Sequence, residues 1–352
     1  MFVALRDLRA ARGRFLLITL VVTLVAVLVS FLSGLTAGLA HQNISAVESL
    51  RADAIVFADT GAQPSFDASA LNPQQVAAWQ DAAGSTGTAD PVGISRTEAD
   101  HAGSPPAQVA LFGTGPTTAG NRAATEPGTV VLSTGAAGEL NAAAGDTVGL
   151  GGHTFTVSAV RGDDWYSHTP VVWMTPGDWR AVSPRGGAAT VLAISDIPNP
   201  SAVNAAAHTT TTSVSGSLSA LASYQAENGS LTLMTVLLFV ISALVIGAFF
   251  TVWTVQRMPD IATLKALGAT SGSLVRDALA QAALVLAAGV TVGLGITVVA
   301  ATFLGDALPF VLGPATTVLP AVALIALGLL GAAFALRFLF TTDPLTALGA
   351  AR

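Results

Sequence analysis

Three residues between positions 224 and 234 carry side chains that could bind a ligand, and their spacing places them on one face of a helix. Tyr224, Glu227 and Met234 recur with the period of an α-helix, so a helix through this segment carries all three on one face. The segment opens a long apolar stretch, and a carboxylate at the edge of a membrane span is costly unless it pairs or faces a cavity. The spacing therefore predicts a site in which Glu227 and Tyr224 contact a ligand and Met234 lines it.

A second group of polar side chains follows an earlier apolar stretch. His41, Gln42 and Glu48 offer an imidazole, an amide and a carboxylate there, and they form the second candidate site. Two structural interpretations of the first site stay open. Glu227 can be a solvated acid stabilised by the N-terminal dipole of its helix, and Tyr224 can be an anchor at the membrane interface.

The sequence argues against catalysis by the chain itself. It contains no cysteine, and its remaining histidines show no spacing typical of a metal site. Tyr166 and His168 are expected to support a strand or a loop. The chain has no G-x-x-x-x-G-K-[ST] loop, its one lysine being Lys265, and no basic tract that would favour nucleic acid. We expect a protein that is not an enzyme, with no cofactor of its own.

Composition points to a membrane protein. Hydrophobic residues make up 52% of the chain and charged residues only 10%, against about 25% charged in ordinary soluble proteins. Four apolar stretches reach the roughly 20 residues that a helix needs to cross the hydrocarbon core. The first is too long for a typical signal-peptide core, so we expect it to remain as a helix. The predicted transmembrane helices are 15–44, 224–257, 278–304 and 316–336.

The basic residues predict the orientation. Nine of the fifteen lie in short segments at the two ends of the chain and between the second and third spans. Basic residues in short loops mark the cytoplasmic side, so we expect a multi-pass plasma membrane protein with both termini in the cytoplasm. The predicted segments outside the spans are an amphipathic N-terminal helix at 1–14, a cytoplasmic segment at 258–277, an outer loop at 305–315 and a cytoplasmic tail at 337–352.

The segment 45–223 reads as a domain on the outer side. Its composition is that of a soluble protein, and short strand-like runs between turn residues alternate with helical patches such as 73–82. Such runs include 54–57, 129–132, 155–157 and 170–173. We therefore predict an α-helical membrane protein with four transmembrane helices and an inserted α+β extracytoplasmic domain. Residues 204–217 are expected to return to the membrane as a flexible stretch.

The cytoplasmic segment between the second and third spans contains a short amphipathic helix. Ile261, Leu264 and Leu267 form an apolar stripe, and Gly268 is typical of a helix end. A small exposed helix with one apolar face favours a protein partner, although it could instead lie on the membrane surface. The small-residue pairs Gly34/Gly38 and Gly289/Gly293 are typical of close helix packing in lipid, and one interpretation places them at a dimer interface.

These motifs resemble those of a known family. The run from Ile261 through Lys265 to Thr270 resembles the coupling segment of FtsX/MacB-type ABC transporter permeases, and residues 343–348 resemble the proline-containing tail of that family. Residues 145–148 and 155–157 resemble a strand pair of its extracytoplasmic domain. The resemblance covers the whole chain. It implies a homodimer in membrane lipid, with two copies of a separate ABC ATPase that hold ATP and Mg²⁺, and coupling through Ile261, Leu264, Lys265, Leu267 and Gly268.

Within this family one branch is more similar. Residues 224–228 with Leu231 and Met234, and residues 165–170, resemble segments of HrtB-type heme exporter permeases. The resemblance implies heme as the transported substrate, with iron bound by Glu227 or Tyr224 and two copies of the site facing each other across the dimer axis. The alternatives are another cargo, such as a peptide, lipid or lipoprotein, and a mechanotransmitter that regulates an extracytoplasmic cell-wall enzyme. The predicted heme-binding residues are Glu227, Tyr224, Met234, Glu48, His41 and Gln42.

Overall fold

The chain forms two compact units, each with its own core. The computed structural model describes residues 12–183, 186–256, 258, 263, 265, 267–304 and 308–336. The membrane unit comprises residues 1–38 and 230–352, and the inserted domain comprises residues 39–229. The predicted N-terminal helix, up to residue 11, and the predicted tail lie outside the described residues.

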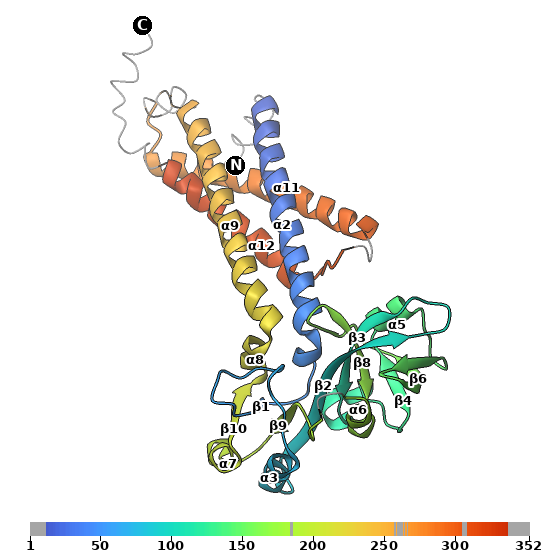
Figure 1. The fold of residues 1–352 in the computed structure, drawn as a ribbon. Coiled ribbons are helices and arrows are strands. Elements are labelled where there is room, and N and C mark those ends of the chain that lie inside the picture. Colours follow the sequence, from blue (N-terminus) through green and yellow to red (C-terminus); the bar gives the residue numbers. More distant parts are fainter. Residues whose placement is uncertain are drawn as a thin grey trace. The chain divides into compact units, whose positions relative to one another are not determined.

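Within the part of the chain that the structure describes, four helices are long and apolar enough to span a bilayer, and Figure 1 shows their arrangement along the chain. This confirms the predicted class of an α-helical membrane protein with an inserted mixed domain. The first helix continues to Glu48, beyond the predicted end, and the third begins at Ser271, before the predicted start. The helices are α2 (Arg12–Glu48), α9 (Ala222–Gln256), α11 (Ser271–Leu304) and α12 (Pro314–Ala335).

Glycines in the membrane unit allow close contacts within the chain. A Cβ atom on Gly289 would lie 2.7 Å from the side chain of Val22, and one on Gly293 would lie 2.6 Å from the Cβ of Ala26. Small residues are used in this way where helices pack in lipid. The second pair behaves similarly, because added Cβ atoms on Gly34 and Gly38 would overlap Phe310 and Pro309. The interpretation of these pairs as a dimer interface is therefore wrong, since both pairs contact residues of their own chain.

Helix α9 packs along one side only. Ser242, Ile246 and Phe250 recur every four residues and are buried in the membrane unit. The side chains of Ile241 and Leu244, on other faces of the helix, are 57% and 70% exposed. In water such an apolar surface would be unfavourable, whereas a bilayer solvates it, as expected for a transmembrane helix.

One part of the inserted domain is a four-stranded antiparallel sheet in the order β10-β1-β9-β2. With two helices, its strands follow the chain order β-α-β, β-α-β, a split arrangement in which the last strand pairs with the first. A buried cluster that includes Trp79, Leu71 and Leu192 fills the space between sheet and helices. The elements are β1 (Ala54–Ala58), α3 (Pro73–Ala83), β2 (Thr88–Asp100), β9 (Val191–Ser195), α7 (Pro200–Ala207) and β10 (Thr209–Ser213).

The other part is a closed ring of strands. From β2 the pairing runs through β3, β8, β4, β6 and β5 and returns to β2, where Ala99 pairs with Leu150. Its interior is a separate apolar cluster that includes Leu111, Leu132 and Met174. The further elements are β3 (Ala107–Gly113), α4 (Pro116–Ala119), β4 (Thr129–Leu132), α5 (Thr134–Leu140), β5 (Thr147–Leu150), β6 (His153–Val160), β7 (Trp165–Tyr166), β8 (Thr169–Met174), α6 (Pro176–Val182) and α8 (Val214–Ser217).

The strand-like runs named from the sequence are present as strands. The runs 54–57, 129–132, 155–157 and 170–173 all lie in strands, and residues 147–150 pair with 153–156 as expected. The prediction of a flexible stretch at 204–217 is wrong. Its threonines form β10, which pairs with β1 along its full length, because β-branched side chains favour a strand once β1 provides a partner.

Replacing Gly293 with alanine is expected to lower the free energy of unfolding by about 1–3 kcal/mol, the usual cost of overpacking. The matched control is Gly295→Ala on the same helix, where nothing lies within 4 Å of the added Cβ and alanine is the better helix former. Thermal unfolding of the purified protein in detergent measures both variants. A Tm for G293A at or above that of G295A would contradict the packing described.

Candidate functional site

The candidate site is built around the tight turn between β7 and β8. Trp165 pairs with Pro170 and Tyr166 with Thr169, which leaves two residues at the tip. These are Ser167 and His168, with φ of 52° and 62°. Two successive positive φ values define a type I′ hairpin turn, which usually contains Asn or Gly, so Ser and His adopt this backbone at some cost.

The end of α2 holds this turn in place. The backbone N–H of Ser167 donates to the carbonyl oxygen of Asn43 at 2.8 Å, and that of His168 donates to the carbonyl oxygen of Gln42 at 2.9 Å. In the second residue pair from the tip, the backbone N–H of Trp165 donates to the hydroxyl of Ser45 at 2.8 Å. These contacts stabilise the turn conformation and so fix the position of the His168 backbone, which carries the imidazole.

The imidazole of His168 meets the carboxylate of Glu227 on the first turns of α9. Nε2 of His168 lies 2.9 Å from Oε1 and 3.0 Å from Oε2 of Glu227. The two side chains are 33% and 39% exposed, so a ligand can reach both. When the imidazole is protonated, the contact is an ion pair with charge-assisted hydrogen bonds.

A short chain of hydrogen bonds connects the pair of His168 and Glu227 to buried residues. The amide Nδ2 of Asn43 donates to Oε2 of Glu227 at 3.3 Å. Its Oδ1 accepts from the hydroxyl of Ser223 at 2.6 Å, and that hydroxyl accepts from the hydroxyl of Ser167 at 2.8 Å. Asn43 itself is only 1% exposed. The network thus joins α2, the β7–β8 turn and the start of α9 within the inserted domain.

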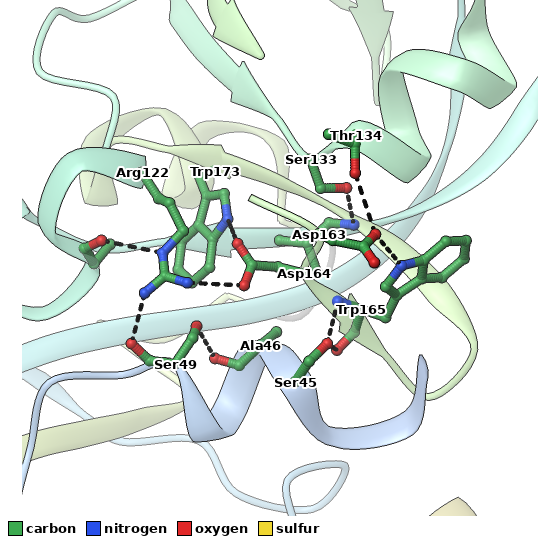
Figure 2. Close-up of polar contacts among 12 residues, drawn as sticks. Ser45, Ala46, Ser49, Arg122, Ser133, Thr134, Asp163, Asp164, Trp165 and Trp173 are labelled. Atoms are coloured by element: carbon green, nitrogen blue, oxygen red, sulfur yellow. Dashed lines mark hydrogen bonds and ion pairs between the residues drawn. The ribbon is translucent and has the colours of Figure 1, made fainter. Parts of the chain in front are cut away.

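A second histidine–carboxylate contact lies before the same hairpin. Nε2 of His41 lies 3.3 Å from Oδ2 of Asp163 and 2.8 Å from its carbonyl oxygen. The other carboxylate oxygen of Asp163 accepts from the indole N–H of Trp165 at 2.7 Å and from the hydroxyl of Thr134 at 3.2 Å (Figure 2). His41 therefore already has a carboxylate partner of its own.

An ion pair with a buried carboxylate and a partly buried arginine fixes the base of the hairpin. Arg122 donates from Nη1 to Asp164 at 3.0 Å and from Nη2 to the carbonyl oxygen of Ser49 at 3.0 Å (Figure 2). The indole N–H of Trp173 donates to the other oxygen of Asp164 at 3.1 Å. Burial raises the pKa of Asp164, against the opposing influence of Arg122 and of the hydrogen bonds. Desolvation thus outweighs pairing, as is common for buried ion pairs.

The structure brings together only part of the predicted site. Glu227 of the first group and Gln42 of the second both contact His168. Tyr224 is half-buried against the apolar core of the inserted domain, which agrees with a structural role for its ring. Glu48 is exposed at the end of α2.

Met234 is 49% exposed and belongs to the membrane unit. Its assignment to the substrate site stays a prediction.

Sequence reasoning missed two of the central residues. His168 was assigned to strand or loop structure, because no spacing in the sequence relates it to Glu227, 59 positions away. Asn43 was overlooked between Gln42 and Ser45. The available signal was a third polar side chain directly after His41 and Gln42, since such a side chain requires hydrogen-bond partners when it is buried.

The predicted coupling residues are described only in part. Ile261 and Leu264 lie outside the described residues. Leu267 is 81% exposed. Gly268 has a φ of 94°, and its N–H donates to the carbonyl oxygen of Lys265 at 3.0 Å, as expected for a glycine that ends a helix.

Comparison with known proteins identifies one region of the chain. Residues 232–344 match the family described as FtsX-like permease C-terminal, so the C-terminal part of the chain resembles an FtsX-like permease domain. The chain is 26% identical over 361 residues, 99% of each chain, to a protein of Staphylococcus haemolyticus described as "Putative hemin transport system permease protein HrtB". A protein of Staphylococcus epidermidis with the same description is 26% identical over 198 residues, 56% of each chain.

A solved structure is also similar to part of the chain. It is the periplasmic region of MacB from Actinobacillus actinomycetemcomitans, with a TM-score of 0.36 and 12% sequence identity. The match covers 48% of this chain and 92% of that one.

The substitution Arg122→Met is expected to destabilise the protein by about 3 kcal/mol, because it leaves the charge of Asp164 buried without a partner. The double variant R122M/D164N should recover part of this loss, since a neutral amide needs no cation and still accepts from Trp173. Arg161→Met is the control, an exposed arginine of the same domain that donates only to a backbone carbonyl. Thermal unfolding followed by tryptophan fluorescence measures all three. A double variant no more stable than R122M would argue against the role given to the charge.

Proposed function

We propose that this chain is the permease subunit of an ABC-type heme exporter in the plasma membrane, a homodimer driven by two copies of a separate ATPase. Two kinds of support lead to this proposal. The first is similarity along the full chain to a relative described as a hemin transport permease. The second, which carries the proposal, is the contact between His168 and Glu227 on an accessible part of the inserted domain.

The chemistry of this pair suits ferric heme. Axial ligands of heme iron come from side chains such as imidazole and phenolate, and carboxylate oxygen is a hard ligand that suits a ferric ion. In the free protein, His168 and Glu227 satisfy each other, which keeps both groups oriented without a ligand. A heme iron would replace one partner of the pair and take Glu227, or the imidazole, as its ligand.

The other predicted residues differ in how well they suit this role. Tyr224 is one helical turn from Glu227, and its phenol is half-buried, so it is better placed to pack beside the substrate than to bind iron. His41 already contacts Asp163, and Glu48 stands apart as an exposed carboxylate. Met234 remains a proposed apolar contact. The proposal therefore rests first on Glu227, then on His168.

Homodimer formation and coupling to an ATPase complete the proposal. The exposed apolar surface of α9, which includes Leu237 and Leu244, is available to lipid or to a second copy of the chain. Two-fold symmetry would present each site twice. The exposed side chain of Leu267 is suited to contact the ATPase on the cytoplasmic side.

Purified protein is expected to bind hemin with a shifted Soret band, and Glu227→Gln should weaken binding at least about tenfold, or 1.4 kcal/mol. The reason is that a neutral amide is a poorer ligand for ferric iron than a carboxylate. Glu126→Gln serves as the matched control, an exposed glutamate elsewhere in the same domain. The measurement is a titration followed by visible absorption.

The outcomes of this titration are distinct. Wild-type protein that gives no hemin spectrum would remove heme as the substrate and leave the permease class in place, with a peptide, lipid or lipoprotein as the next substrates to test. Equal affinities for E227Q and E126Q would move the site away from Glu227.

The proposed orientation can be tested with single cysteines, since the natural chain has none. Ser85→Cys, exposed in the inserted domain, should react with a membrane-impermeant maleimide in intact cells. Gly272→Cys, exposed at the start of α11 with nothing within 4 Å of its Cβ position, should react only after permeabilisation. Labelling of both positions from the same side would overturn the orientation.

A further inference from the structure

The amide of Asn43 stands out among the residues around the proposed site. It is 1% exposed, whereas the carboxylate that it contacts is 39% exposed. A buried amide without partners is costly, and this one has a partner on each side: the hydroxyl of Ser223 on Oδ1 and the carboxylate of Glu227 on Nδ2. Asn43 is thus a buried group, with a partner for each of its two polar atoms, in contact with an accessible one.

The donors and acceptors around Asn43 define its orientation. The hydroxyl of Ser223 donates to Oδ1, which turns the NH₂ group toward Glu227. A rotated amide would place Oδ1 against the carboxylate, where two acceptors repel each other. In the contact between Ser167 and Ser223, the hydroxyl of Ser167 is the donor. The single hydroxyl proton of Ser223 is therefore left to donate to Asn43. The hydrogen-bond chain Ser167, Ser223, Asn43, Glu227 therefore runs in one direction and ends at the carboxylate.

The two carboxylate oxygens of Glu227 are not equivalent as a result. Oε2 contacts both Asn43 and His168, at 3.3 Å and 3.0 Å, whereas Oε1 contacts His168 at 2.9 Å. A carboxylate held only by His168 could rotate with it. The bond from Asn43 fixes Oε2 and leaves Oε1 as the oxygen that can exchange His168 for another partner.

We propose that Asn43 is the positioning residue of this site, holding the Glu227 carboxylate so that Oε1 faces the substrate. This inference rests on the proposed function. It assigns to Asn43 no contact with the substrate itself, because the amide is buried. It explains why α2 carries a buried polar residue at the point where its carbonyl oxygens hold the Ser167–His168 turn.

The test compares hemin with metal-free protoporphyrin IX on the full-length protein in detergent. Asn43→Leu keeps the size of the side chain and removes both polar atoms. We expect it to weaken hemin binding about tenfold and to change protoporphyrin binding by less than about threefold, because only hemin uses the iron ligand. Ser223→Ala, which removes the hydroxyl that orients the amide, should shift hemin binding in the same direction by about threefold, and it decides the question if N43L does not fold.

The matched control is Asn72→Asp, a change at the N-cap of α3 in the same domain, where aspartate caps equally well. Equal weakening of both porphyrins by the Asn43 and Ser223 variants would overturn the proposal, because it would indicate a general structural defect. Unchanged hemin binding in both variants, with E227Q still weakened, would overturn it while leaving the proposed function in place. Absence of hemin binding by the wild-type protein would instead remove the proposed function and this inference together.

Discussion

The arrangement of the candidate site depends on one set of backbone hydrogen bonds. Two residues with positive φ form the tip of the β7–β8 hairpin, and their N–H groups donate to carbonyl oxygens near the end of α2. These acceptors offset the cost of a positive φ at Ser167 and His168, a backbone conformation that glycine favours. Because the turn is fixed, the imidazole of His168 meets the first turns of α9, and the polar network around Glu227 can form.

Two histidine–carboxylate contacts and one arginine–carboxylate pair surround this hairpin, and they differ in physical character. In the pair of Arg122 and Asp164 the carboxylate is buried, and desolvation raises the pKa of Asp164. This ion pair positions the hairpin, because Arg122 also donates to the carbonyl oxygen of Ser49. The pair of His168 and Glu227 is accessible and can be opened by a ligand at modest cost. The buried carboxylate thus suits a structural role, and the accessible one suits a ligand.

Much of the architecture follows from the sequence, because the forces that decide it are local. Length and hydropathy alone define the transmembrane helices, and alternation between turn residues locates strands such as β4. The stretch 204–217 was misjudged, since its threonines become a strand only when β1 lies beside them. The role of Gly34 and Gly289 was also misjudged, because the contact is long-range. A small residue indicates that another segment packs closely against it, but its spacing does not identify that segment.

The candidate site shows the same limit. Helical spacing predicts Glu227 as a functional residue, but nothing local relates it to His168 or Asn43, which reach it through long-range packing. Helical spacing also grouped Tyr224 with Glu227, although the aromatic ring packs on the core. Periodicity identifies which residues share a face, whereas only the tertiary fold decides which groups complete a polar network.

The strand β2 belongs to both parts of the inserted domain. Its first residues pair with β9 in the open sheet, ending at Val92 opposite Val191, and the next residues pair with β3 in the ring. The chain therefore leaves the sheet and returns to it at adjacent positions, as in a hairpin whose loop has grown into a second folded body. Such a loop costs little additional closure entropy as it lengthens. The pairing of β2 with β9 therefore sets the register of the sheet independently of the length of the segment that forms the ring.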